Sequence, residues 1–145
     1  MKNYFMIGLM AFLFLAACGN ELDKQVNALR AEVIAVHDEV MPKMTEISKL
    51  QNEVSERIAS MKGDSTELDM AKVKSAKQVH EALVVAEQAM NDWMVGFHEV
   101  DMQKVDAKTM LDALKGEQTK VNDVKEKMLS SIAEAQAFLK GKSNE

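Results

Sequence analysis

One cysteine closes an apolar run near the start of this chain, and its thiol is the strongest nucleophile in the sequence. Residues 15–19 read Leu-Ala-Ala-Cys-Gly, and Cys18 is the only cysteine in the chain. Small residues leading up to a cysteine are typical of a lipobox, in which the sulfur is acylated and the chain is cleaved just before it. We therefore expect Cys18 to be the lipidated first residue of the mature protein. With this thiol acylated, no disulfide framework can form.

The residues before Cys18 have the pattern of a secretory leader. Lys2 supplies a positive charge, and residues 4–15 form an apolar segment that is shorter than the roughly 20 residues of a spanning helix. Residues 1–17 are therefore predicted to be a signal peptide that is removed, and residues 18–24 a lipidated N-terminus with a short tether. Covalent palmitate-type chains contribute about 0.8 kcal/mol per buried methylene to membrane anchoring. The alternatives are an ordinary signal peptide with a chance cysteine, or an N-terminal anchor that stays attached.

A second set of chemically capable residues combines imidazole and thioether side chains. His37 and Met41 lie four residues apart, on one face of a helix, and Met90 and Met94 repeat that spacing. If the chain folds back midway between the two pairs, they lie at similar levels, beside Trp93. Such ligands suit Cu(I), and an adjacent indole can shield that ion. The plainer interpretation is that methionine and tryptophan fill a helical core. Haem, which needs a far larger pocket, is a third reading.

Three long helices are predicted to position these residues. Apolar residues recur every seven positions from Glu21 to Met61, which is typical of a coiled-coil seam. Two comparable seams follow, separated by breaks near Gly63 and after Val100, where Gly96 is an alternative C-cap. The predicted helices span about 21–61, 66–100 and 106–140, and residues 141–145 form a polar tail. The first column consists of Val26, Val33, Val40, Ile47, Val54 and Met61.

Short loops between long helices make antiparallel neighbours. The sequence therefore predicts an all-α fold, an elongated antiparallel (up-down-up) three-helix bundle over residues 25–140 with coiled-coil-like packing. The rival is an oligomeric coiled coil, because β-branched residues at one seam position and leucine at the other favour parallel dimers. We favour a monomer over the dimer, because the second and third helices also need partners and the chain itself supplies them.

Pro42 falls inside the first predicted helix. Proline in a helix interior removes a hydrogen bond and clashes with the preceding turn, at a cost of about 3 kcal/mol. The seam keeps its phase from Val40 to Ile47, so we expect one continuous helix that bends at Pro42. The alternative is two helices, 21–40 and 42–61.

Two further placements follow from the helical register. Folding the third helix back about residue 103 predicts that Gly116 lies level with His37. The positions just before the first column are all glutamate, and the sequence predicts that they form a solvated flank: Glu32, Glu39, Glu46 and Glu53.

Composition and motifs argue against several classes of function. The formal net charge is −5 and no basic cluster stands out, so we expect no nucleic-acid partner and no polybasic attraction to anionic lipid. The chain has no G-x-G-x-x-G, Walker loop, H-E-x-x-H or nucleophile elbow. A rod of three helices is also predicted to offer no concave pocket. We therefore expect that the protein is not an enzyme.

Two segments carry a resemblance. Residues 37–44 (HDEVMPKM) and 89–94 (AMNDWM) resemble segments of small helical lipoproteins of Gram-negative bacteria. Some of these are labelled "viral A-type inclusion protein-like", which reflects coiled-coil similarity. The resemblance implies no assigned activity, so no functional residues are carried over. The residue after the cysteine is Gly19 rather than aspartate, and in this the chain resembles lipoproteins that are sorted to the outer membrane.

Together these features predict a lipid-anchored protein of the bacterial cell envelope, most simply on the outer membrane. Its partners would be the membrane, through the lipid on Cys18, and another envelope protein. Its role would be that of a non-enzymatic structural or protein-interaction module. The alternative is a soft-metal module of the Cu(I) type, built from the His37, Met41, Met90 and Met94 layer.

Overall fold

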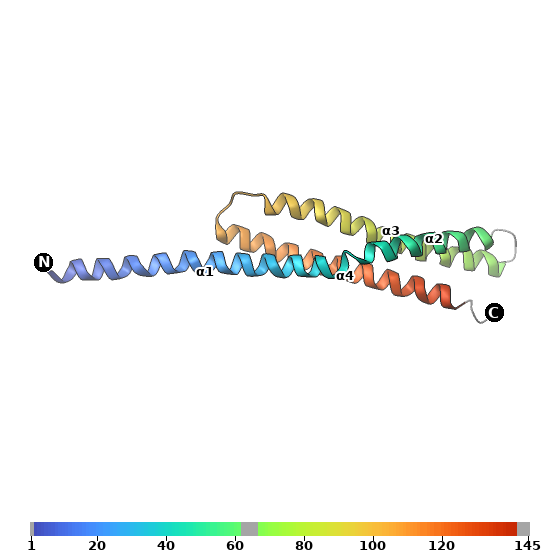
Figure 1. Cartoon of the computed structure of the whole chain (residues 1–145), viewed down its shortest axis with the longest axis horizontal. Coiled ribbons are helices and arrows are strands. Elements are labelled where there is room, and N and C mark those ends of the chain that lie inside the picture. The colour runs from blue at the N-terminus through green and yellow to red at the C-terminus, as the bar shows by residue number, and fades with distance from the viewer. Residues whose placement is uncertain (1, 62–66, 142–145) are drawn as a thin grey trace.

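The protein is all-helical in its described part and folds as a helical bundle (Figure 1). The computed structural model describes residues 2–61 and 67–141, with side chains for 21–61 and 70–141. The predicted break at Gly63 and most of the polar tail lie outside the described residues, as does the side chain of Cys18. The helices are α1 (Lys2–Val40), α2 (Lys43–Met61), α3 (Glu67–Asp101) and α4 (Ala107–Lys140).

The N-terminal helix is longer than predicted. Helix α1 includes residues 18–24, which the sequence predicted as a short tether. No glycine-proline pair or run of turn residues interrupts this stretch, so nothing in it stops a helix from continuing. Figure 1 shows the first part of α1 extending beyond the other three helices.

The chain breaks at Pro42 rather than bending within one helix. Helix α1 ends at Val40 and α2 begins at Lys43, so the prediction of a continuous helix was wrong and the two-helix alternative describes the chain better. The amide of Met41 still donates to the His37 carbonyl at 2.8 Å, but Pro42 has no N–H to continue the series. The Met44 amide donates to the Met41 carbonyl at 3.1 Å, which restarts the helix after a tight turn.

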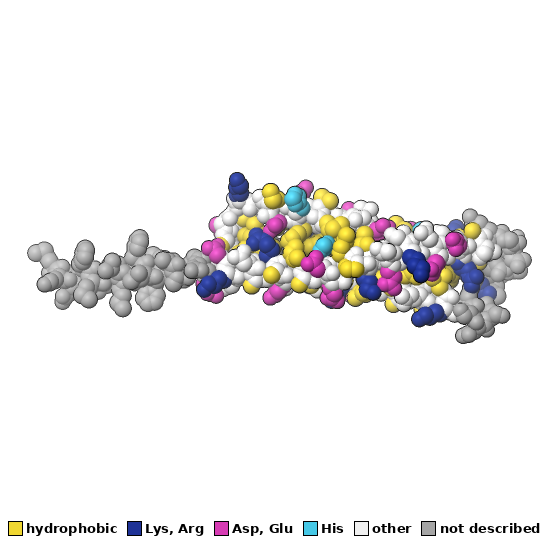
Figure 2. Space-filling model, viewed as in Figure 1, with side chains coloured by type: hydrophobic (Ala, Val, Ile, Leu, Met, Phe, Trp, Pro, Cys, Tyr) yellow, Lys and Arg dark blue, Asp and Glu magenta, His cyan; other side chains and the backbone are white. Residues whose placement is uncertain are grey.

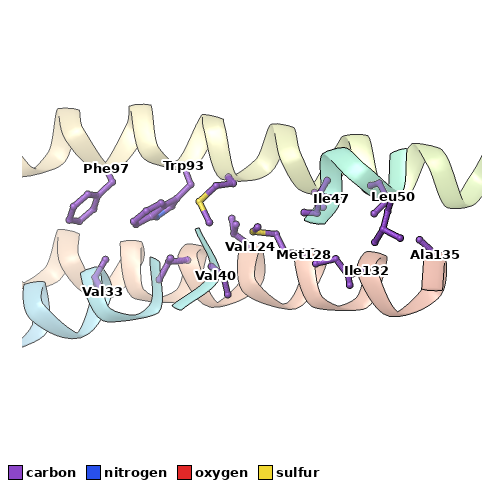
Figure 3. Close-up of a cluster of buried hydrophobic side chains, with 14 of the residues drawn as sticks. Val33, Val40, Ile47, Leu50, Trp93, Phe97, Val124, Met128, Ile132 and Ala135 are labelled. Atoms are coloured by element: carbon purple, nitrogen blue, oxygen red, sulfur yellow. The ribbon is translucent and has the colours of Figure 1, made fainter. Parts of the chain in front are cut away.

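The apolar repeat continues through this break. Val33, Val40, Ile47 and Val54 are each spaced by seven residues, and all are 0–1% exposed. Helix α4 packs against α1, α2 and α3, and α2 also packs against α3. Side chains from all four helices therefore meet in one interior (Figure 3): Val33, Val40, Ile47, Leu50, Trp93, Phe97, Val124, Met128, Ile132 and Ala135.

The buried stripe of α4 is not purely apolar. It begins at Met110, and two polar residues, Glu117 and Ser131, stand within it. The Ser131 hydroxyl donates to the Met128 carbonyl at 3.0 Å, which satisfies it. The stripe alternates steps of four and three residues: Met110, Leu114, Glu117, Val121, Val124, Met128, Ser131 and Ala135.

Helix α4 begins with a side-chain cap that the sequence analysis did not identify. The Asp106 carboxylate accepts hydrogen bonds from the Lys108 amide at 3.1 Å and from the Thr109 amide at 3.0 Å. The Thr109 hydroxyl donates to it at 2.7 Å, and this bond is the main reason why the pKa of Asp106 lies below its ordinary value. Helix α3 runs past Gly96 to Asp101, so the alternative C-cap at Gly96 was wrong.

Replacing Asp106 by alanine should lower the melting temperature, because it leaves helix amides unsatisfied. Asp106→Asn is the control, since an amide oxygen caps nearly as well. A carboxyl group whose pKa is lower in the folded than in the unfolded state stabilises the fold at pH values above the unfolded-state pKa. That contribution is lost as the pH falls through the folded-state pKa. The gap between wild type and Asp106→Ala should therefore hold at neutral pH and narrow only below about 3.8. Melting curves by circular dichroism across pH test this, and equal melting temperatures at pH 7 would contradict it.

Candidate functional site

The structure brings His37 of α1 against Trp93 of α3. Their ring centroids are 5.6 Å apart, and Trp93 is in turn stacked on Phe97 with centroids 5.0 Å apart. Figure 3 shows Trp93 and Phe97 side by side on α3, directed toward the interior. The His37 Nδ1 atom lies 2.9 Å from the Asp38 carboxylate, so one ring nitrogen already has a partner.

The three methionines of the predicted metal layer have different surroundings. Met90 is fully buried in the hydrophobic core, Met94 is half-buried against it, and Met41 is 38% exposed beside the Pro42 break. Among the side chains that the structure describes, no group of three or more His, Cys, Asp or Glu residues is placed to hold a metal ion. Met90 and Met94 serve packing in this arrangement, and copper binding by the layer stays a prediction.

Long side chains make the contact between α1 and α3. The Arg30 guanidinium donates to the Asp101 carboxylate, and the His37 ring meets the Trp93 ring. Since helix separation follows the size of the side chains between the helices, an indole and a guanidinium require a wide spacing. At the level of His37, we therefore expect the large side chains between α1 and α3 to keep these two helices apart.

Among the residues that the structure describes, none provides a hydrogen-bond partner for the buried indole N–H of Trp93, and the residue as a whole is only 6% exposed. An unsatisfied buried donor costs free energy, so most native structures avoid one. The benefit that offsets this cost is the large apolar area that the two rings of tryptophan bury in the core.

The predicted solvated flank of glutamates is confirmed for Glu32 and Glu39, which are exposed, whereas Glu46 and Glu53 are half-buried. Side chains of α4 also donate hydrogen bonds to three of the four. A polar side chain beside a core position is well placed to reach the neighbouring helix. The bonds are Gln118 to Glu32 at 2.9 Å, Lys125 to Glu39 at 2.6 Å and Gln136 to Glu46 at 2.8 Å.

Gly116 does not lie level with His37, as the sequence analysis had predicted. Lys125 donates to Glu39, which places residues near 123 at the level of His37. The prediction assumed a fold-back about residue 103, whereas α4 begins only at Ala107. Gly116 is exposed, and a Cβ added there would meet nothing within 4 Å.

A pocket lies in the seam between α3 and α4, where the sequence analysis predicted none. It has a volume of about 290 Å³. Trp93 and Gly96 of α3 line it together with Glu117, Lys120 and Val124 of α4. Neither helix alone carries a motif for this site, and only the register between them brings the residues together.

Comparisons with known proteins give no significant match, whether with protein-family models, curated proteins or solved structures. Within the residues that the structure describes, no helix combines the length and the apolar character needed to cross a membrane. The resemblance to small envelope lipoproteins therefore remains an interpretation of the sequence.

Trp93 offers a test of how this layer is held together. Trp93→Ala should cost about 3–5 kcal/mol of unfolding free energy, because it leaves a cavity between α1, α3 and α4. Trp93→Phe should cost much less, since it keeps most of the apolar area and removes the unsatisfied N–H. Urea unfolding followed by circular dichroism measures both. Equal losses in the two variants would contradict the view that the apolar area of the ring holds this layer together.

Proposed function

We propose that this protein is a lipid-anchored component of the bacterial envelope that acts as a non-enzymatic structural or protein-interaction module. The observation that carries the proposal is the Leu-Ala-Ala-Cys-Gly sequence at 15–19, followed by a body in which every described element is helical. An acylated Cys18 would hold the bundle at a membrane surface. The body, whose elongated form and charged outer surface are seen in Figure 2, would then serve as a spacer that presents its outer helix faces to another envelope protein.

In this proposal the bundle has an up-down-up order with coiled-coil-like packing. The hydrogen bonds between α1 and α4 support a parallel pair. Gln118 donates to Glu32. Seven residues further along both helices, Lys125 donates to Glu39. Equal seven-residue steps in the same direction are what two parallel helices with heptad packing give.

The contacts of α3 support the opposite direction for that helix. Arg30, early in the chain, pairs with Asp101 near the end of α3. Gln51, later in the chain, donates to Glu87, which comes earlier in α3, at 2.8 Å. Residue numbers that rise on one helix and fall on the other are the mark of antiparallel neighbours. Because the seams bury one another within one chain, we favour a monomer.

Lipidation is tested by replacing the acyl acceptor. The full-length protein should incorporate labelled palmitate in a Gram-negative host, whereas Cys18→Ser should incorporate none and should accumulate as the uncleaved precursor. Ser55→Cys in the Cys18→Ser background is the control, because it restores a thiol at an exposed position outside the proposed lipobox. Label in Cys18→Ser, or its normal processing, would overturn the lipobox assignment.

A partner is tested by crosslinking from the outer face of α3. Val95 is 65% exposed and points away from the core, so a photo-crosslinking amino acid there should capture a distinct envelope protein in cells. The control position is Glu39, which is already engaged by Lys125 of the same chain. Capture of only a second copy from Val95 would favour the oligomeric coiled coil instead.

A further inference from the structure

The pocket between α3 and α4 combines an aromatic wall with a buried carboxylate. Trp93 and Val124 form its apolar part, and Figure 3 shows these two side chains on facing helices. Glu117 lines the same pocket, although its side chain is only 4% exposed. A buried carboxylate and an indole that line the same pocket are a favourable setting for a positively charged group.

Glu117 occupies a position in the α4 stripe where its neighbours are apolar. Leu114 and Val121, one step before and after it, are both fully buried. Removing a carboxylate from water is costly unless an opposite charge accompanies it. In the described part of the chain, the cation that pairs with it is Lys120, whose Nζ lies 2.8 Å away while its side chain is 66% exposed. That lysine is free to turn outward into water.

Gly96 lines the pocket together with Trp93. It lies inside α3, where glycine is less favourable than alanine by about 1 kcal/mol. A Cβ at this position would meet nothing within 4 Å, and its backbone has no positive φ, so neither crowding nor backbone conformation requires glycine. The absent side chain leaves space that a ligand can use.

We propose that this pocket binds a small organic cation, with a primary or quaternary ammonium group. The ammonium would take the place of Lys120 on the Glu117 carboxylate and rest against the Trp93 ring. Three carboxylates and two lysines line the pocket, so its own balance is negative. The volume of about 290 Å³ is at the lower end of ligand pockets. Choline and ethanolamine carry this chemistry, either free or as lipid head groups.

Trp93 is the chain's single tryptophan, so its fluorescence reports on the site directly. The full chain in a non-ionic detergent is titrated with choline, with ethanolamine and with 3,3-dimethyl-1-butanol, the uncharged isostere of choline. A saturable change with either amine and none with the alcohol is expected. A second arm uses vesicles of phosphatidylglycerol with and without phosphatidylethanolamine. A response only to vesicles with phosphatidylethanolamine would assign the cation to a lipid head group.

Variants separate the charge from the shape of the pocket. Glu117→Gln should weaken amine binding at least tenfold, and Gly96→Leu should abolish it by filling the pocket. Gly116→Leu is the matched control, since it makes the same change at an exposed position that does not line the pocket. Glu117→Leu should remain folded, because apolar replacements of buried charges are tolerated, and should bind no amine.

The proposal is overturned by any of three results. The first is that neither a free amine nor phosphatidylethanolamine in vesicles gives a saturable response. The second is an equal response to choline and to its neutral isostere. The third is unchanged amine binding in Glu117→Gln. Circular dichroism of every variant shows whether a loss of binding comes from unfolding. If Glu117→Gln unfolds, the amine binding of Glu117→Leu and Gly96→Leu tests the proposal instead.

Discussion

The fold depends on keeping one apolar face in phase across a proline. Val33 and Val40 precede Pro42, Ile47 and Val54 follow it, and all are almost completely buried. The seven-residue spacing means that α1 and α2 turn the same face inward even though the helix is interrupted between them. A single helix, α4, can therefore pack against both. A shift of one residue at the break would turn the Ile47 column by about 100° and expose it to water.

The size of the side chains between helices determines where the rod is tight and where it is open. Against α2, helix α3 buries Ala76, Leu83 and Ala86, of which two are small. Further along, α3 meets α1 through Trp93, whose ring contacts His37 and is stacked on Phe97, and these rings need more room. The same tryptophan also lines the pocket, together with Gly96. The packing of one large side chain thus links the bundle to the proposed cation site.

The helices could be read from the sequence because their signals are local and repeated. A seven-residue apolar pattern over several turns indicates a helix and its buried face, and the columns through Val33 and Ile47 are buried as their spacing predicts. The break at Pro42 was harder to read, because proline is compatible with both a bend and an interruption. Whether the helix bends or breaks at Pro42 depends on the hydrogen bonds of the turn from Met41 to Met44.

The site residues were harder to predict because they depend on the register between helices. Nothing in the sequence near Glu117 marks it as buried, since glutamate in a helix is usually on the surface. Glu39 is exposed as predicted, but its hydrogen bond with Lys125, across a separation of 86 residues, was not foreseen. Such pairings appear only when two helices are aligned to within a turn. The proposed lipidation of Cys18 is inferred from a local sequence pattern, and the side chain of Cys18 lies outside the described residues.

The most direct test of the account is whether the α1 and α4 seams meet within one molecule. Cysteines replace Glu39 and Lys125 in the Cys18→Ser background, and a short bismaleimide is added to dilute protein. The account predicts fast crosslinking within single chains, with helix content unchanged. A control pair at Glu39 and Glu126 should react more slowly, because Glu126 is exposed on another face of α4. Crosslinks only between chains, or equal rates for the two pairs, would contradict the account.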